Sequence, residues 1–168
     1  ASNIFDTESV RTSYIKDKVL PEEHFKAGKA AQFGIKCEPL AQEIYEDMTQ
    51  TKIQEYGCIK HKTISYLGAS PDGIVVEAKD PSMLGRMLEI KNVYSRKLNG
   101  IPLYGYWVQC QIQMEVCNLE YRDFFECDMN QNLSEDAFFD RRKNGNLNKY
   151  NGIIIEYTNG DTQKYEYS

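Results

Sequence analysis

The strongest restriction on the fold comes from two short segments, residues 68–73 (GASPDG) and 88–92 (LEIKN). Each borders a run of apolar and β-branched residues that is typical of a strand, and a loop rich in turn residues separates the two runs. Such a hairpin brings Asp72 near Glu89, and because side chains alternate along a strand, Glu89 and Lys91 project from the same face. The chain is therefore expected to form a sheet that gathers two carboxylates and an amine in one small volume.

Two carboxylates and a lysine in one place suit metal-assisted chemistry on phosphates. Mg²⁺ in proteins sits on one or two carboxylates together with water and substrate phosphates. A nearby ammonium can orient an attacking water and offset the charge that develops on a phosphate. Glu-x-Lys is a common tripeptide, however, and Glu89 and Lys91 by themselves are more typical of an exposed charged face of a strand. A functional interpretation requires the other segments in their order.

Length and charge limit the classes of protein that need to be considered. The 168 residues, of which 41% are apolar and 27% charged, suit one globular domain over residues 1–168 and exclude a disordered or collagen-like chain. The formal net charge of −5 provides no overall positive field that would attract nucleic acid, so any contact with phosphates has to be local. Apolar runs stay far below the ~20 residues of a membrane helix, and no membrane partner is expected.

Cysteine usage indicates the compartment. The five cysteines are odd in number and contain no C-x-x-C pair, which favours reduced thiols in an intracellular protein. Cys58 and His61 lie three residues apart, but a zinc site needs four convergent ligands, so free thiols are favoured over zinc. The chain starts at Ala1 without a signal-like pattern, and we interpret this as a trimmed start and not as a targeting segment.

The rest of the chain alternates between helical and strand patterns. Helix formers dominate residues 21–33, and a second helix is expected to begin with Pro39 in its first turn. Four residues of that helix share one face and are expected in the core: Leu40, Ile44, Tyr45 and Met48. Strands are expected at residues 59–66, 73–76, 87–93 and 121–127, and in a hairpin of residues 152–157 and 162–167 that turns at Asn159-Gly160. This order predicts an α+β fold or a mixed α/β sandwich.

Residues 106–119 satisfy two rules that disagree. Apolar residues alternate with Gln109, Gln111 and Gln113, which is a strand pattern. At about 100° per residue, however, the same apolar residues fall on two opposite faces of a helix, as in a helix that is buried on both sides. Glutamine and methionine favour helix over strand, so a helix is the preferred interpretation.

Taken together, four motifs resemble the lambda-exonuclease/YqaJ viral recombinase family of the PD-(D/E)xK nuclease superfamily. They are GxxxExxAxxxY at residues 34–45, GASPDG at 68–73, LEIK at 88–91 and YxxQxQxxM at 106–114. The resemblance covers residues 33–114. It implies a PD-(D/E)xK nuclease domain with a restriction-endonuclease-like core, in which helices flank a central mixed sheet.

The resemblance also implies a role for each matching residue. Asp72 and Glu89, with the Ile90 carbonyl, are expected to hold the catalytic metal, which would be one or two Mg²⁺ or Mn²⁺ ions. Lys91 is expected to position or activate the attacking water. Glu38 matches the glutamate that reaches the same site from the preceding helix and can help hold a second ion.

The glutamine motif is expected to complete the catalytic group. Gln109 matches the family residue that steadies the water or a phosphate oxygen. Gln109 and Gln111 point about 200° apart on a helix, so only one can face the site, while Tyr106, Gln109 and Gln113 share a flank. Substrate contacts are expected from four residues: Ser70, Tyr106, Arg96 and Lys97.

The implied activity is that of a metal-dependent deoxyribonuclease, a 5′-to-3′ exonuclease that acts on duplex DNA ends in phage or viral recombination. Its partners would be duplex DNA with free ends, a single-strand annealing protein and further copies of itself, in the host cytoplasm or nucleus. An alternative is an endonuclease of the same superfamily acting on DNA or RNA, because the family's Trp-x-x-x-Arg and Thr-Ala-Ser stretch for the 5′ phosphate is missing. A non-catalytic nucleic-acid-binding module is the third alternative, and the intact Asp, Glu and Lys set argues against it.

Overall fold

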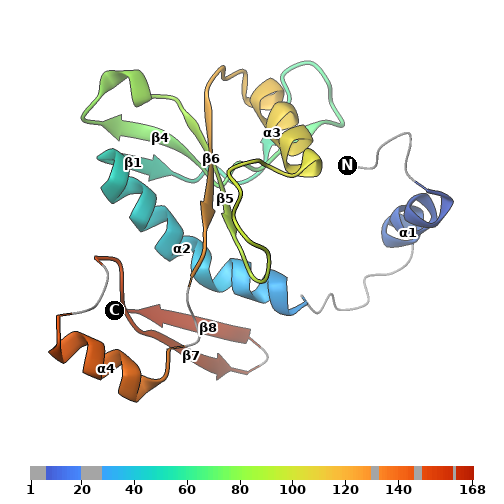
Figure 1. Ribbon diagram of the computed structural model, residues 1–168. Helices are drawn as coiled ribbons and strands as arrows, with labels where there is room; N and C mark the ends of the chain where they lie inside the picture. Colours follow the sequence, from blue (N-terminus) through green and yellow to red (C-terminus); the bar gives the residue numbers. More distant parts are fainter. Residues whose placement is uncertain (1–6, 20–27, 130–132, 146–148, 161) are drawn as a thin grey trace.

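The computed structural model describes residues 7–19, 28–129, 133–145, 149–160 and 162–168, and a four-stranded mixed sheet forms its centre (Figure 1). The strand order is β1-β4-β5-β6, where β4–β5 and β1–β4 are antiparallel pairs and β5–β6 is a parallel pair. The strands are β1 (Thr51–Gln54), β4 (Gly73–Ala78), β5 (Met87–Asn92) and β6 (Arg122–Cys127). The predicted α+β fold with a central mixed sheet is therefore confirmed, and so are the strands expected around residues 73–76, 87–93 and 121–127.

Helix α2 (Lys29–Thr49) packs its apolar face against this sheet. The buried residues of the helix recur at intervals of four, which places them in one stripe along its axis. They are Phe33, Cys37, Ala41 and Tyr45. Ala41 and Tyr45 contact the core side chains of the sheet, which are Val75, Leu88 and Ile90. Burial of this stripe fixes α2 beside β5, the strand that carries Glu89.

Pro39 lies inside α2, so the prediction that a separate helix begins there is wrong. An internal proline costs about 3 kcal/mol because it lacks an N–H donor and crowds the preceding turn. The apolar stripe continues without interruption from Cys37 to Ala41, and its burial outweighs that cost. Met48, expected in the core, is 61% exposed. Much of the helix expected at residues 21–33 falls on positions 20–27, outside the described residues.

Helix α3 (Tyr104–Cys117) connects β5 to the parallel strand β6, which confirms the preference for a helix in this segment. Parallel strands cannot be joined by a tight turn and need a crossover, which is usually a helix. Cys110, Gln113 and Val116 are buried on the inner side of α3, whereas Gln111 is exposed. The helix therefore presents one set of its glutamines toward β5.

The segment between β1 and β4 differs from the prediction. Residues 59–66 form only a two-residue strand, β2 (Ile59–Lys60), which pairs with β3 (Gly68–Ala69). Between them, Nδ1 of His61 accepts hydrogen bonds from the backbone N–H groups of Thr63 and Ile64, at 3.1 and 3.0 Å. This side-chain acceptor stabilises a turn and ends the strand early. The loop from β4 to β5 contains a short 3-10 helix, η1 (Pro81–Met83).

The terminal parts of the chain lie outside this central sheet (Figure 1). They comprise α1 (Glu8–Val19), α4 (Glu135–Lys143) and the hairpin of β7 (Ile154–Asn159) and β8 (Thr162–Tyr167). The predicted hairpin is confirmed, and Asn159, which was expected in the turn, pairs with Thr162 as the last residue of β7. The Tyr167 hydroxyl donates to the Lys36 carbonyl at 2.9 Å and joins the hairpin to α2. None of the helices within the described ranges is long and apolar enough to cross a membrane.

Candidate active site

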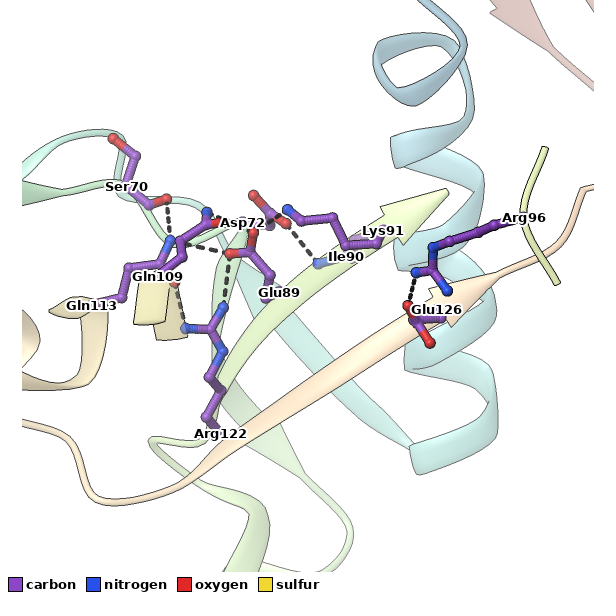
Figure 2. Close-up of polar contacts among 10 residues, drawn as sticks. All are labelled: Ser70, Asp72, Glu89, Ile90, Lys91, Arg96, Gln109, Gln113, Arg122 and Glu126. Carbon is purple, nitrogen blue, oxygen red and sulfur yellow. Dashed lines mark hydrogen bonds and ion pairs between the residues drawn. The ribbon is translucent and has the colours of Figure 1, made fainter. Parts of the chain in front are cut away.

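The side chain of Glu89 lies at the centre of the candidate site and is fully buried in β5. Its carboxylate accepts hydrogen bonds from four side chains (Figure 2). Oε1 accepts from Nζ of Lys91 and, at 2.7 Å, from Nε2 of Gln109. Oε2 accepts from Nε2 of Gln113 at 3.0 Å and from Nη2 of Arg122 at 2.7 Å. A carboxylate without access to water needs such partners, because burying an unpaired charge is strongly unfavourable.

Each of the four donors comes from β5 itself or from an element beside it. Lys91 follows Glu89 by two residues on β5, so both side chains lie on one face of the sheet, as predicted. Gln109 and Gln113 are four residues apart on α3 and therefore share one side of that helix. Arg122 is the first residue of β6, and it reaches Glu89 because β6 runs parallel to β5.

Asp72 lies in the bend immediately before β4 and is tied to β5. Its Oδ2 accepts a hydrogen bond from the backbone N–H of Ile90 at 2.6 Å (Figure 2). Burial raises the pKa of the Asp72 carboxyl, and the negative charge of Glu89 raises it further, although the bond from Ile90 and the charge of Lys91 lower it. The structure therefore brings together two carboxylates that repel each other, and a divalent cation between them would relieve the repulsion.

The raised pKa of Asp72 predicts a stability change that depends on pH. Its folded-state pKa lies above the unfolded value near 3.8, so the contribution of this carboxyl to stability is lost as the pH rises through the folded pKa. An Asp72→Asn variant stays neutral and can still accept from Ile90. In EDTA it is expected to unfold at a higher temperature than the wild type at about pH 8, with the difference disappearing below about pH 4.

Calorimetric unfolding between these two pH values measures the effect, and Asp80→Asn provides a control of opposite sign. Hydrogen bonds from Ser82 lower the pKa of Asp80, so its ionised form stabilises the fold at neutral pH. Asp80→Asn should therefore lower the unfolding temperature at about pH 8 and lose that effect in acid. An Asp72→Asn difference that is the same at both pH values would contradict the prediction.

Glu38 is coupled electrostatically to this pair but projects from an exposed position on α2. Desolvation raises the pKa of the Glu38 carboxyl, and the charges of Asp72, Glu55 and Glu89 raise it too, against the lowering effect of Lys91. Across the described ranges, no three His, Cys, Asp or Glu side chains are grouped closely enough to hold a metal ion. The structure thus joins Asp72 to the Glu89 region, and the role of Glu38 as a ligand stays a prediction.

A cavity of about 480 Å³ opens between α2 and the end of β5, where Ile90 and Lys91 line it. Small residues of α2, which are Ala30, Ala31 and Gly34, form part of its wall together with Glu38, Ile90, Lys91, Arg96 and Tyr106. The side chain of Lys91 is 24% exposed, and its Nζ lies 5.3 Å from the centre of the Tyr106 ring, a distance that permits a cation–π contact. The ammonium group of Lys91 is thus available to a molecule that enters the cavity.

Of the four residues predicted to contact substrate, Arg96 and Tyr106 line this cavity, and Ser70 and Lys97 are not among its lining residues. Arg96 forms an ion pair with Glu126, which neutralises its charge (Figure 2). Lys97 is exposed, and Tyr106 is partly buried on α3. Ser70 contributes its backbone carbonyl, which accepts from Nε2 of Gln113 at 2.9 Å, while the residue as a whole is exposed. Their roles toward substrate stay predictions.

Two residues of the site were not assigned from the sequence. Gln113 was expected to share a flank of α3 with Tyr106 and Gln109, and that helical spacing was the available signal. Arg122 carried no signal, because it belongs to none of the four motifs and follows Glu89 by 33 positions. Only the parallel pairing of β5 and β6 brings it to Glu89.

Comparison with known proteins identifies relatives that include nucleases. Residues 1–120 match the YqaJ-like viral recombinase domain family. The uncharacterized protein R354 of Acanthamoeba polyphaga mimivirus is 29% identical over 125 residues, which are 68% of this chain and 23% of that protein. A structure of LHK-Exo in complex with dAMP aligns with a TM-score of 0.51 and 30% identity, over 67% of this chain and 56% of that one.

A second solved structure is that of an alkaline exonuclease, LHK-Exo from Laribacter hongkongensis, with a TM-score of 0.50 and 30% identity. The chain covers 56% of that exonuclease and 23% of the viral protein, so it corresponds to only part of each relative. The family match nevertheless includes α2, β1 to β5 and α3, which contain Asp72, Glu89 and Lys91. The chain belongs to the YqaJ-like viral recombinase domain family.

Proposed function

We propose that this domain is a divalent-metal-dependent deoxyribonuclease that hydrolyses phosphodiester bonds as a 5′-to-3′ exonuclease on duplex DNA ends. One observation carries the proposal: Asp72 and Glu89 lie together beside Lys91, whose partly exposed side chain lines a cavity of about 480 Å³. The 30% identity to an alkaline exonuclease supports this assignment of substrate class.

The donor set suits Mg²⁺ or Mn²⁺. Both ions prefer oxygen ligands, and Mg²⁺ commonly takes one or two carboxylates together with waters and substrate phosphates. Asp72 and Glu89 would supply the carboxylate oxygens, the Ile90 carbonyl a further oxygen, and Glu38 a ligand for a second ion. Burial and the charge of Glu89 raise the pKa of Asp72, and a cation held by both carboxylates would offset their repulsion. When bound, the ion would make water more acidic and neutralise charge on the phosphate.

The remaining side chains would position the water and the phosphate. Lys91 would turn from Glu89 toward the cavity, where its ammonium can donate to the attacking water or to a phosphate oxygen. Gln109 donates to the same oxygen of Glu89 as Lys91, so its amide lies where it can steady the water. A local cationic lining of this kind allows an acidic protein with a net charge of −5 to approach DNA.

Digestion of three labelled substrates tests the proposal. Linear duplex DNA labelled at the 5′ end should release mononucleotide label at once in Mg²⁺ or Mn²⁺ and none in EDTA. The same duplex labelled at the 3′ end should release its label late, and a closed circular duplex should remain intact. Cleavage of the circle would instead favour the endonuclease alternative, and no digestion of any substrate in either metal would refute a nuclease role for the domain.

A further inference from the structure

Arg122 is a buried charge to which the proposed chemistry assigns no role. Its side chain is 4% exposed, and its Nη2 donates to Oε2 of the fully buried Glu89 at 2.7 Å. Its Nη1 donates to Oε1 of Gln113, whose Nε2 donates back to the same Oε2 of Glu89 at 3.0 Å. Arg122, Gln113 and Glu89 therefore form a closed ring of hydrogen bonds around one carboxylate oxygen (Figure 2).

The two oxygens of Glu89 have different kinds of partner. Oε2 faces Arg122 and Gln113, which are both buried. Oε1 faces Gln109 and the partly exposed Lys91, which also lines the cavity. A long lysine side chain can rotate toward solvent, whereas removing Arg122 from Glu89 would leave a charge buried without its partner. Oε2 is thus held permanently, and Oε1 is the oxygen whose partners can change.

We propose that Arg122 is a positioning residue for metal binding. It fixes the Glu89 side chain so that Oε1 is presented beside Asp72 as the metal ligand, and Gln113 braces both groups. It also remains as the counter-charge of Glu89 when Lys91 turns to the substrate. This inference rests on the proposed function, and it concerns a residue that lies beyond the part of the chain matched to the family.

The shape of arginine is essential to this role. A guanidinium group is a planar fork with several donors, so Arg122 bonds Glu89 and Gln113 at the same time. Gln113 also bonds the carbonyl of Ser70 at 2.9 Å, which connects the ring to the bend that carries Asp72. A lysine would keep the positive charge but not the fork. The Mn²⁺ affinity of Arg122→Lys is therefore expected to lie between that of the wild type and that of a neutral variant.

Calorimetric titration of Mn²⁺ into the full chain tests the proposal. Arg122→Gln should bind Mn²⁺ about 10- to 100-fold more weakly than the wild type, as is typical when a residue that supports a metal ligand is lost. Arg86→Gln is a matched control, because Nη1 of Arg86 pairs with Oδ1 of Asp123, the next residue on β6, at 2.9 Å. This control removes a partly buried arginine–carboxylate pair that does not involve Glu89, so its Mn²⁺ affinity should stay at the wild-type level.

Unfolding temperatures in EDTA, measured on the same samples, separate positioning from stability. If Arg122 is purely structural, Arg122→Gln should lower the unfolding temperature, as is also expected for Arg86→Gln, and leave the Mn²⁺ affinity unchanged. That result, or tighter Mn²⁺ binding, would overturn the proposal. If Arg122→Gln does not fold, Arg122→Lys decides by the same criteria. If the wild-type chain binds no Mn²⁺, the proposed function fails as well. If the wild type and the Arg122 variants bind Mn²⁺ equally well, only the role of Arg122 is refuted.

Discussion

A Glu89→Gln variant is expected to lose Mg²⁺-dependent DNA hydrolysis and Mn²⁺ binding by at least about 100-fold. Glutamine matches the size of glutamate but lacks the negative charge that the proposed cation requires. Replacing a residue that merely supports a metal ligand already lowers metal affinity or activity about 10- to 100-fold. Losing the ligand itself should therefore reach at least the upper end of that range. The amide oxygen of glutamine can still accept from Arg122, so a hydrogen bond to the buried guanidinium is kept although its counter-charge is lost.

Replacing Glu89 by alanine would test the stability of the fold and not only metal binding. Glu89→Ala leaves the 4% exposed Arg122 without a carboxylate, and breaking a buried pair in this way costs about 3–5 kcal/mol of unfolding free energy. A loss of activity could then reflect a loss of folded protein. Urea unfolding in EDTA should accordingly show Glu89→Ala well below Glu89→Gln. Full hydrolysis by a folded Glu89→Gln variant would contradict the assignment of Glu89 as a ligand.

Replacing Lys91 by alanine is expected to lower the rate of the chemical step by about 10²- to 10³-fold while Mn²⁺ affinity is kept or increased. The ammonium of Lys91 would act on the water or the phosphate, so its loss affects the transition state. It also occupies Oε1 of Glu89, and its removal frees that oxygen and takes away a charge that repels the cation. The positive charge of Arg122 still balances the negative charge of Glu89, so the fold should be retained.

Single-turnover digestion of 5′-labelled duplex at saturating Mg²⁺, combined with Mn²⁺ titration, measures both quantities. Lys52→Ala serves as the control, because Lys52 forms an exposed ion pair with Glu46 and should leave both unchanged. The contrast with Glu89→Gln is the decisive comparison, since one variant keeps metal binding and the other loses it. Parallel loss of Mn²⁺ binding in Lys91→Ala would show that the lysine supports the carboxylates and has no role of its own in hydrolysis.

Elements with a clear local pattern could be predicted from the sequence. The strands β4 and β5, the loop between them and the C-terminal hairpin follow from alternation and turn residues within each segment. Asp72, Glu89, Lys91 and Gln109 were identified from motifs and spacing, and the structure gathers these four around β5. The choice of Gln109 over Gln111 rested on the match to the family's glutamine motif and was supported by helical geometry, and Gln111 is indeed exposed.

Elements in which packing or a side chain overrides the local pattern were predicted wrongly. Pro39 is a strong local signal for the start of a helix, but the buried stripe of α2 continues through it. Residues 59–66 read as one strand, but hydrogen bonds to His61 turn the chain after Lys60. For Pro39 the deciding contacts are those of α2 with the sheet, far away in the sequence. For residues 59–66 they lie within the segment, but they join a side chain to the backbone, and the alternation of apolar residues carries no information about such bonds.

The sequence alone supplied the motifs from which the site residues were predicted. It also placed Glu89 with Lys91 on one face of β5 and Gln109 with Gln113 on one flank of α3, because alternation and helical periodicity are properties of single segments. The tertiary structure decided how the charge of Glu89 is balanced. Arg122 meets Glu89 only because α3 returns the chain to a parallel strand, whose register no local pattern specifies. Because both side chains are buried, losing either one would leave the charge of the other without a partner and would destabilise the fold.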